Sequence, residues 1–105
     1  MKLENEKALI RTIAEGNTKS FEVLFYSYYP RLKGFICDLL QSPEEAEDIS
    51  QDIFTTLWQN RTSLDKVDNI SAYLFRIAKN AVYRHIERNM LFKNYQQKQT
   101  ESIPN

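Results

Sequence analysis

Apolar residues of this chain recur at helical spacing, and little in the sequence interrupts them. Only two glycines and three prolines occur among the 105 residues, and no stretch alternates apolar with polar residues as a half-buried strand does. Apolar positions instead return every three or four residues, as on the buried face of a helix. The pattern predicts an all-α fold, a compact bundle of four to five helices with an orthogonal or up-and-down arrangement.

Breaks in this pattern divide the first part of the chain into two helices. The first is expected from about Glu4 to Glu15, because Gly16-Asn17 offers the left-handed turn that ends many helices. A second helix should follow with Thr18 as its N-cap, and Pro30 inside it should kink or divide it. Its apolar stripe consists of Phe21, Leu24, Phe25, Tyr28, Leu32, Phe35, Ile36 and Leu39.

The clearest helix start is the segment Ser42-Pro43-Glu44-Glu45. Serine is a favoured N-cap, proline suits the first helical position, and Glu45 stands where a capping box needs an acid. This third helix should reach about Asn60. Its inward positions are predicted to be Ala46, Ile49, Ile53 and Leu57.

The last part of the chain is predicted to hold a loop, a fourth helix and a tail. Residues 61–68 are polar without periodicity, which indicates a loop, and Asn69 is a good cap for a helix that should extend to about Tyr95. We therefore expect one folded domain at residues 1–95, followed at 96–105 by the start of a flexible linker. The inward positions of the fourth helix are predicted to be Leu74, Ile77, Ala78, Ala81 and Val82.

Residues suited to catalysis or metal binding are few. Cys37 is the single cysteine and His85 the single histidine, which excludes a disulfide within the chain, a Cys/His zinc pattern and a triad. Cys37 is expected to be a buried thiol and His85 a surface or core-edge side chain. The sequence therefore indicates a binding domain and not an enzyme, with no catalytic residue, metal or cofactor.

No segment suggests export or membrane insertion. The first fifteen residues mix charged with apolar side chains and lack the apolar run of a signal peptide. Nowhere does the chain approach the eighteen or so consecutive apolar residues that a membrane-spanning helix needs. A lone cysteine also agrees with a reducing compartment. These features predict a cytoplasmic protein that does not insert into membranes.

Charge is separated along the chain although the net charge is zero. Residues 43–60 contain five acids and no base, whereas residues 70–98 contain six bases and one acid, Glu87. Such separation indicates two faces with two different partners, or alternatively two solvated helix faces that happen to differ.

Bases and aromatic residues alternate on the fourth helix in a way that favours nucleic acid. Cations follow a phosphate backbone, and exposed rings give unpaired bases a surface to stack on. Helical spacing is expected to place the main group on one face, namely Arg76, Lys79, Asn80, Tyr83 and Arg84. Alternatively, the rings of Tyr73, Phe75 and Tyr83 belong to the core.

Three segments, taken in order, resemble one protein family. The sequence AYLFRIAKNAVYRHIER, at 72–88, resembles the part of group IV, or extracytoplasmic-function (ECF), sigma factors that opens the promoter −10 element. AEDISQDIFTTLW, at 46–58, resembles their core-polymerase-binding helix, and SFEVLFYSYYPRL, at 20–32, resembles the first conserved helix of the same domain. The likeness, to region 2 of the sigma-70 family, extends over about residues 3–94.

The resemblance implies two sets of site residues. The acidic helix would dock on the clamp helices of the polymerase beta-prime subunit, and the fourth helix would hold the single non-template strand of the −10 element, with the loop 61–69 receiving a flipped base. The polymerase-binding residues would be Asp48, Gln51, Asp52, Thr55, Trp58 and Gln59. The DNA-binding residues would be Asp65, Asn69, Tyr73, Arg76, Lys79, Asn80, Tyr83, Arg84 and Arg88. Phe54 and Trp58 form a second apolar stripe on the acidic helix, which suits either the core or an interface.

Two departures from the family pattern accompany the resemblance. Many members carry an acid four residues after the motif asparagine, where this chain has Arg84, a change that would strengthen phosphate binding over base reading. The family also has a second domain, a helix-turn-helix that reads the −35 element, so we expect this chain to be an excised domain. An anti-sigma factor is a further expected partner. The alternative function is a helical protein-interaction module without DNA contact.

Overall fold

The computed structural model describes residues 6–102, with side chains described through Lys93. Four α-helices and one 3-10 helix follow one another, and no strand occurs within this range, which confirms the predicted all-α fold. Their bounds are α1 Glu6–Ala14, α2 Thr18–Leu40, α3 Pro43–Gln59, η1 Arg61–Lys66 and α4 Ile70–Ser102.

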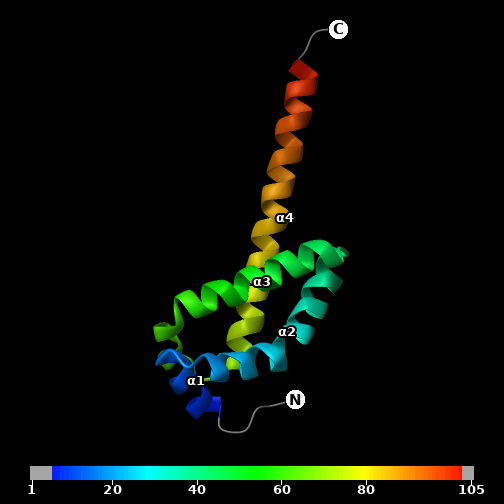
Figure 1. The fold of residues 1–105 in the computed structure, drawn as a ribbon. Helices are drawn as coiled ribbons and strands as arrows, with labels where there is room; N and C mark the ends of the chain where they lie inside the picture. The colour runs from blue at the N-terminus through cyan, green and yellow to red at the C-terminus, as the bar shows by residue number, and fades with distance from the viewer. Residues whose placement is uncertain (1–5, 103–105) are drawn as a thin grey trace.

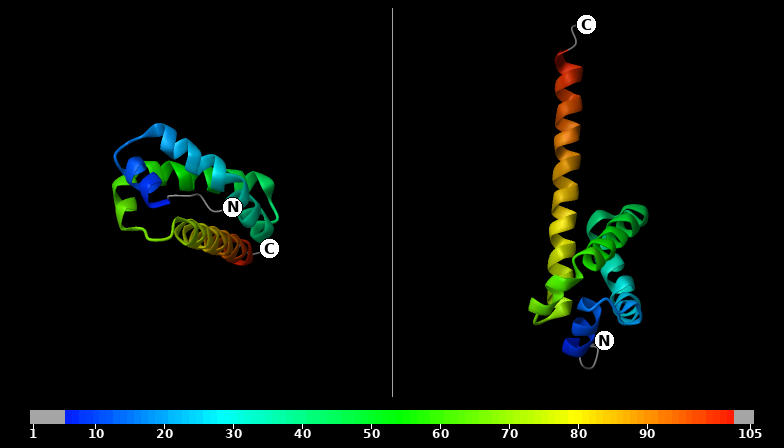
Figure 2. Two further views of the ribbon diagram at one scale, coloured as in Figure 1. Left: turned by 90° about the horizontal axis from the view of Figure 1, so that it is seen from below. Right: turned by 60° about the vertical axis from the view of Figure 1, so that its left-hand side comes forward.

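Helices α2 and α3 lie side by side, and α1 packs against α2 and η1 at one end of this pair. The first half of α4 packs against both α2 and α3, whereas its second half projects beyond the bundle (Figures 1 and 2). This projection gives the chain its principal extents of 65 × 24 × 20 Å. Within residues 6–102, no helix is both long and apolar enough to cross a membrane.

Helix α1 ends and helix α2 begins close to the predicted positions. Gly16 has a φ of +97°, the left-handed conformation expected after α1. The N-cap of α2 is Asn17 and not Thr18, since the Asn17 Oδ1 accepts from the Ser20 N–H at 3.0 Å. Pro30 does not divide α2, which runs unbroken and changes direction along its length (Figure 1). The missing proline N–H costs one backbone bond, and packing on both sides keeps the helix continuous.

The start of α3 forms half of the predicted capping box. Ser42 Oγ accepts from the Glu45 N–H at 3.3 Å, and Pro43 occupies the first turn. The Glu45 carboxylate, however, lies 3.3 Å from His85 Nε2 on α4. This contact joins the start of α3 to the middle of α4, and it places the half-buried His85 at the core edge as predicted.

Replacing Ser42 by alanine is expected to destabilise the domain by about 0.5–2 kcal/mol, because the Glu45 N–H would lose its acceptor. Urea unfolding followed by circular dichroism measures the change. Thr18→Ala is the matched control, since Thr18 is exposed and Asn17 caps α2 in its place. Equal losses in both variants would contradict the capping role of Ser42.

Most predicted inward positions form the core, which lies where α2, α3 and the first half of α4 meet. Leu39, at the end of α2, is 46% exposed and was wrongly placed in the stripe, and Cys37 is half-buried and not buried. Phe54 belongs to the core at 2% exposure. The buried apolar residues are Ile10, Ile13, Leu24, Tyr28, Leu32, Ile36, Ala46, Ile53, Phe54, Leu57, Leu64, Ile70, Leu74, Ala78 and Val82.

Two stretches are more regular than the sequence pattern predicted. Residues 61–66 form the 3-10 helix η1, because Leu64, 1% exposed, packs into the core beside α1 and holds the segment in place. Helix α4 continues past Tyr95 to Ser102, in keeping with a stretch of lysine, glutamine and glutamate that contains no glycine or proline. Residues 103–105 of the predicted linker lie outside the described range, so the boundary of the domain stays a prediction.

Tyr28 links α2 to α1 inside the bundle. Its ring is fully buried, and its hydroxyl donates to Glu6 Oε1 at 3.3 Å. Burial, reinforced by the nearby Glu6 carboxylate, raises the pKa of Tyr28 above its usual value of 10.0. The hydroxyl therefore remains protonated at neutral pH, and its hydrogen bond to Glu6 holds α1 against α2.

Candidate functional site

The predicted polymerase-binding residues share the solvent side of α3. Asp48, Gln51, Asp52, Thr55 and Gln59 are all exposed, and their spacing of three or four residues places them along one face. The opposite face carries Ala46, Ile53 and Leu57, which are buried in the core. Helix α3 thus presents a continuous polar surface with net negative charge.

Trp58 lies at the edge of this surface and is half-buried. Its ring centroid is 5.1 Å from that of Phe21, and the Arg61 guanidinium lies over it at 4.4 Å. Arg61 also donates from Nη1 to the Trp58 carbonyl oxygen at 3.0 Å. Trp58 therefore packs the end of α3 against α2 and η1. The part of its side chain that remains exposed is accessible to a partner.

The predicted DNA-binding residues of α4 divide between two sides of the helix. Arg76, Lys79, Asn80 and Tyr83 are exposed on the outer side, with Tyr83 at 55%. The Lys79 ammonium lies 5.7 Å from the Tyr83 ring centroid, so a cation and an exposed ring are held together. Arg84, predicted to share this face, turns instead toward α3.

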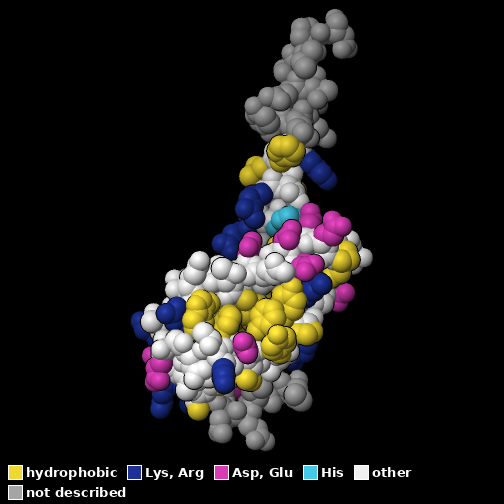
Figure 3. Space-filling model, in the orientation of Figure 1, with side chains coloured by type: hydrophobic (Ala, Val, Ile, Leu, Met, Phe, Trp, Pro, Cys, Tyr) yellow, Lys and Arg dark blue, Asp and Glu magenta, His cyan; other side chains and the backbone are white. Residues whose placement is uncertain are grey.

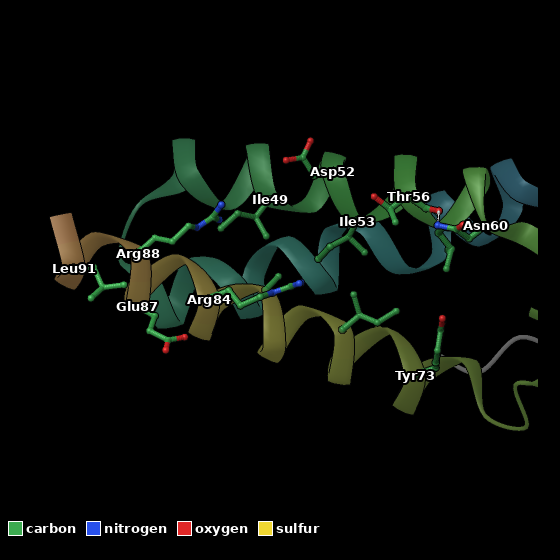
Figure 4. A pocket seen from close by; sticks show the side chains of 13 residues that line it. Ile49, Asp52, Ile53, Thr56, Asn60, Tyr73, Arg84, Glu87, Arg88 and Leu91 are labelled. Atoms are coloured by element: carbon green, nitrogen blue, oxygen red, sulfur yellow. Dashed lines mark hydrogen bonds between the residues drawn. The ribbon is translucent and has the colours of Figure 1, made fainter. Parts of the chain in front are cut away.

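A groove of about 630 Å³ separates α3 from α4. Arg88 reaches from α4 toward α3, Arg84 runs along the groove, and Asp52 stands at the outer edge of the opposite wall (Figure 4). The groove therefore brings one predicted polymerase residue beside three predicted DNA residues, the third being Tyr73. Its lining comprises Ile49, Asp52, Ile53, Thr56, Leu57, Asn60, Tyr73, Ile77, Ala81, Arg84, Glu87, Arg88 and Leu91.

Tyr73 and Phe75 differ in what their rings do. Tyr73 is half-buried in the groove wall, and the Arg76 guanidinium lies 5.7 Å from its centroid. Phe75 packs edge-on against Phe35 of α2 at 5.3 Å and belongs to the periphery of the core. Tyr83 and Tyr73 thus remain candidates for base stacking, whereas Phe75 does not.

The segment before α4 holds the remaining two predicted DNA residues. Asp65 is exposed on η1, which its neighbour Leu64 anchors to the core. Asn69 is exposed too, and its Oδ1 caps α4 by accepting from the Ala72 N–H at 3.0 Å. The side-chain carbonyl of Asn69 thus serves the helix cap, and its amide N–H₂ can donate to a ligand.

Groups that could hold a metal do not assemble in the described part of the chain, where no three His, Cys, Asp or Glu residues come together. The groups exposed on α3 are mainly carboxylates and amides, and those exposed on α4 include cations and the Tyr83 ring. Such surfaces bind a protein and a polyanion respectively.

Comparison with known proteins identifies the family of the chain. Residues 24–91 match the family described as sigma-70 region 2, and the chain belongs to that family. The RNA polymerase sigma-H factor of Pseudomonas aeruginosa is 23% identical over 83 residues, 79% of this chain and 43% of that protein. The ECF RNA polymerase sigma factor RpoE of Cereibacter sphaeroides is 31% identical over 75 residues, 70% of this chain and 41% of that protein. The chain thus spans about two fifths of these relatives. No solved structure is a significant match.

Proposed function

We propose that this domain works in transcription initiation as part of a sigma factor that binds core RNA polymerase and captures the melted −10 element. Membership of the region 2 family and the names of the relatives support this role. The observation that carries it is the separation of two surfaces, an acidic and amide-rich face on α3 and a basic, ring-bearing α4. The setting would be the cytoplasm, where the polymerase works.

The α3 face is the proposed polymerase contact. Asp48, Gln51 and Asp52 lie together on its exposed side, with Thr55 and then Gln59 on the following turns. In the proposal they meet the clamp helices of the beta-prime subunit, and charge complementarity speeds and orients the docking. Trp58 adds an aromatic edge to the same contact. An anti-sigma factor would be a competing partner for these residues.

Helix α4 and η1 are the proposed strand contact. Arg76, Lys79 and Arg84 would follow the phosphates, while Tyr83 would stack on an unpaired base and Asn80 would hydrogen-bond one. Flipping a base into a pocket costs a few kcal/mol, which these contacts would offset. The domain captures a strand in this scheme without making or breaking a bond, so it needs no catalytic residue or cofactor.

Calorimetric titration with a purified beta-prime clamp-helix fragment tests the proposal. We expect saturable binding by the wild type and loss of measurable binding when Asp48, Gln51 and Asp52 are all alanine, because three polar contacts disappear from one turn of α3. The double change Glu15→Ala/Asp38→Ala removes the same charge from exposed sites elsewhere and should leave binding intact. If the wild-type domain does not bind the fragment, the proposed role is refuted. If the triple variant still binds, the assignment of these three residues to the contact is refuted.

A further inference from the structure

The part of α4 that projects beyond the bundle carries apolar side chains that its own chain does not cover. Val82 is the last buried residue of α4 among those whose side chains are described. Beyond it, Tyr83, Met90 and Leu91 are each more than half exposed, at 55%, 59% and 65%. Figure 3 shows hydrophobic and basic side chains together where the helix leaves the bundle. Exposed apolar groups gathered in this way mark a surface that binds another molecule.

Helical spacing sorts these side chains onto two sides of the projecting helix. Tyr83, Ile86 and Met90 follow one another at intervals of three and four residues, so they form one stripe, which we call the α4 stripe. Leu91 borders the α4 stripe on the side of the groove between α3 and α4. Phe92 follows Met90 by two residues, about 200° around the helix, and lies on the opposite side. The α4 stripe is therefore a distinct face of the helix.

Two charged residues flank the α4 stripe in a self-complementary way. Glu87 and Lys93 are both exposed and stand three residues before and three residues after Met90, which places them on opposite sides of the stripe. When two such helices pair antiparallel about a two-fold axis at Met90, Glu87 of one copy comes beside Lys93 of the other, and the same contact forms twice. Ile86 of one copy then comes near Leu91 of the other. The contact has an apolar centre and a charged rim, the usual composition of a protein interface.

Charge favours the antiparallel pair over a parallel one. Arg76 and Lys79 precede the α4 stripe on the same face of the helix. A parallel pair would hold these cations of both copies at one level, where like charges oppose association. An antiparallel pair moves the two basic segments to opposite ends. Because α4 projects beyond its bundle (Figure 2), the two bundles then lie at opposite ends as well.

We propose that the α4 stripe pairs two copies of this chain, antiparallel about a two-fold axis near Met90. The interface is isologous, since the same residues contribute from both copies. Tyr83 belongs to the stripe and, with the Lys79 ammonium 5.7 Å from its ring centroid, also to the proposed strand contact. The pair therefore covers part of the strand-binding face, and strand binding separates the two copies. This masking rests on the proposed function, whereas the pairing itself does not.

Sedimentation velocity of the 105-residue chain tests the pairing. Between about 1 µM and about 1 mM, a range that spans moderate and weak association, we expect a concentration-dependent equilibrium of monomer and dimer. Met90→Glu should raise the dissociation constant of the dimer about tenfold or more, because it places two carboxylates face to face at the axis. Phe92→Glu is the matched control. It makes the same charge change at a 61% exposed apolar residue on the opposite side of α4, and it should dimerise like the wild type.

A charge exchange tests the antiparallel register. Glu87→Lys and Lys93→Glu should each weaken the dimer about threefold or more. The two changes combined should restore it, because opposite charges then face each other again with their positions exchanged. A chain that stays monomeric throughout, or a dimer that Met90→Glu does not weaken, overturns the pairing and leaves the α4 stripe to a different partner. A double variant that is as weak as the single ones overturns the register.

Addition of single-stranded −10 DNA to the dimer tests the masking. We expect the strand to convert the dimer to strand-bound monomer. Met90→Glu should bind the strand more tightly than the wild type does at protein concentrations where the wild type is paired. A dimer that holds the strand without separating overturns the masking. If neither protein binds the strand, the strand contact of the proposed function fails and the masking fails with it, while the pairing is decided by sedimentation alone.

Discussion

Replacing Phe54 by alanine is expected to destabilise the domain by about 3–5 kcal/mol, the cost of removing a large ring from a packed core. Phe54 is 2% exposed, and the rings of Phe21, Phe25 and Tyr29 lie within 6.3 Å of it. These neighbours belong to α2, so the cavity would open between α2 and α3. A domain of this kind has a total stability of only about 5–15 kcal/mol, so the variant should be partly unfolded near physiological temperature.

Urea unfolding followed by far-ultraviolet circular dichroism measures this loss, and Phe54→Leu should recover a large part of it by refilling the cavity. Phe92→Ala is the control, because Phe92 is 61% exposed on the projecting half of α4 and its loss should change stability by less than about 0.5 kcal/mol. A loss below about 1 kcal/mol for Phe54→Ala would contradict its place in the core.

Helical spacing was sufficient to predict the four α-helices and most of the core. The sets Leu24, Tyr28, Leu32 and Leu74, Ala78, Val82 follow three- and four-residue spacing, and tertiary packing agreed with that local pattern. Burial of Leu64 was not predictable from local spacing, and for Phe54 the spacing left core and interface as alternatives. Leu64 sits in a polar segment, and it is buried because α1 packs against η1.

The candidate site was predictable where one helix supplies it and not where two helices meet. A helical wheel alone places Asp48, Gln51 and Asp52 on one face of α3. The groove between α3 and α4, and the Glu45–His85 pair, depend on the way these helices cross. Arg84 lines that groove and Arg76 and Lys79 do not, although the three were grouped together from helical spacing alone.

The aromatic residues of α2 show a third case, in which one spacing pattern covers both buried and exposed rings. Phe21, Phe25 and Tyr29 recur every four residues on α2, as core residues do, and their inner edges do pack on Phe54. The exposed Tyr26 falls outside that spacing. Its exposure, 74% of the side chain, is visible only in three dimensions.

Replacing Arg76, Lys79 and Arg84 together by alanine is expected to remove most of the affinity of the domain for single-stranded −10 DNA. Binding to a strand depends on salt through counterion release, with a slope of about 0.7 for each phosphate contact. Losing three contacts should make the negative slope of log K against log salt shallower by roughly 2. It should also weaken binding at low salt on the order of a hundredfold. Fluorescence anisotropy with a labelled strand at several salt concentrations measures both.

Charge alone would give a smaller and less specific effect, and a second triple variant separates the two causes. Lys7, Arg11 and Lys19 are exposed bases of α1 and the start of α2, so their replacement by alanine lowers the net charge equally without touching α4. That control should keep most of the salt slope. Equal losses in the two variants would show that overall charge, and not the α4 surface, attracts the strand. No effect of the α4 variant, even within a polymerase complex, would favour a protein-interaction module without DNA contact.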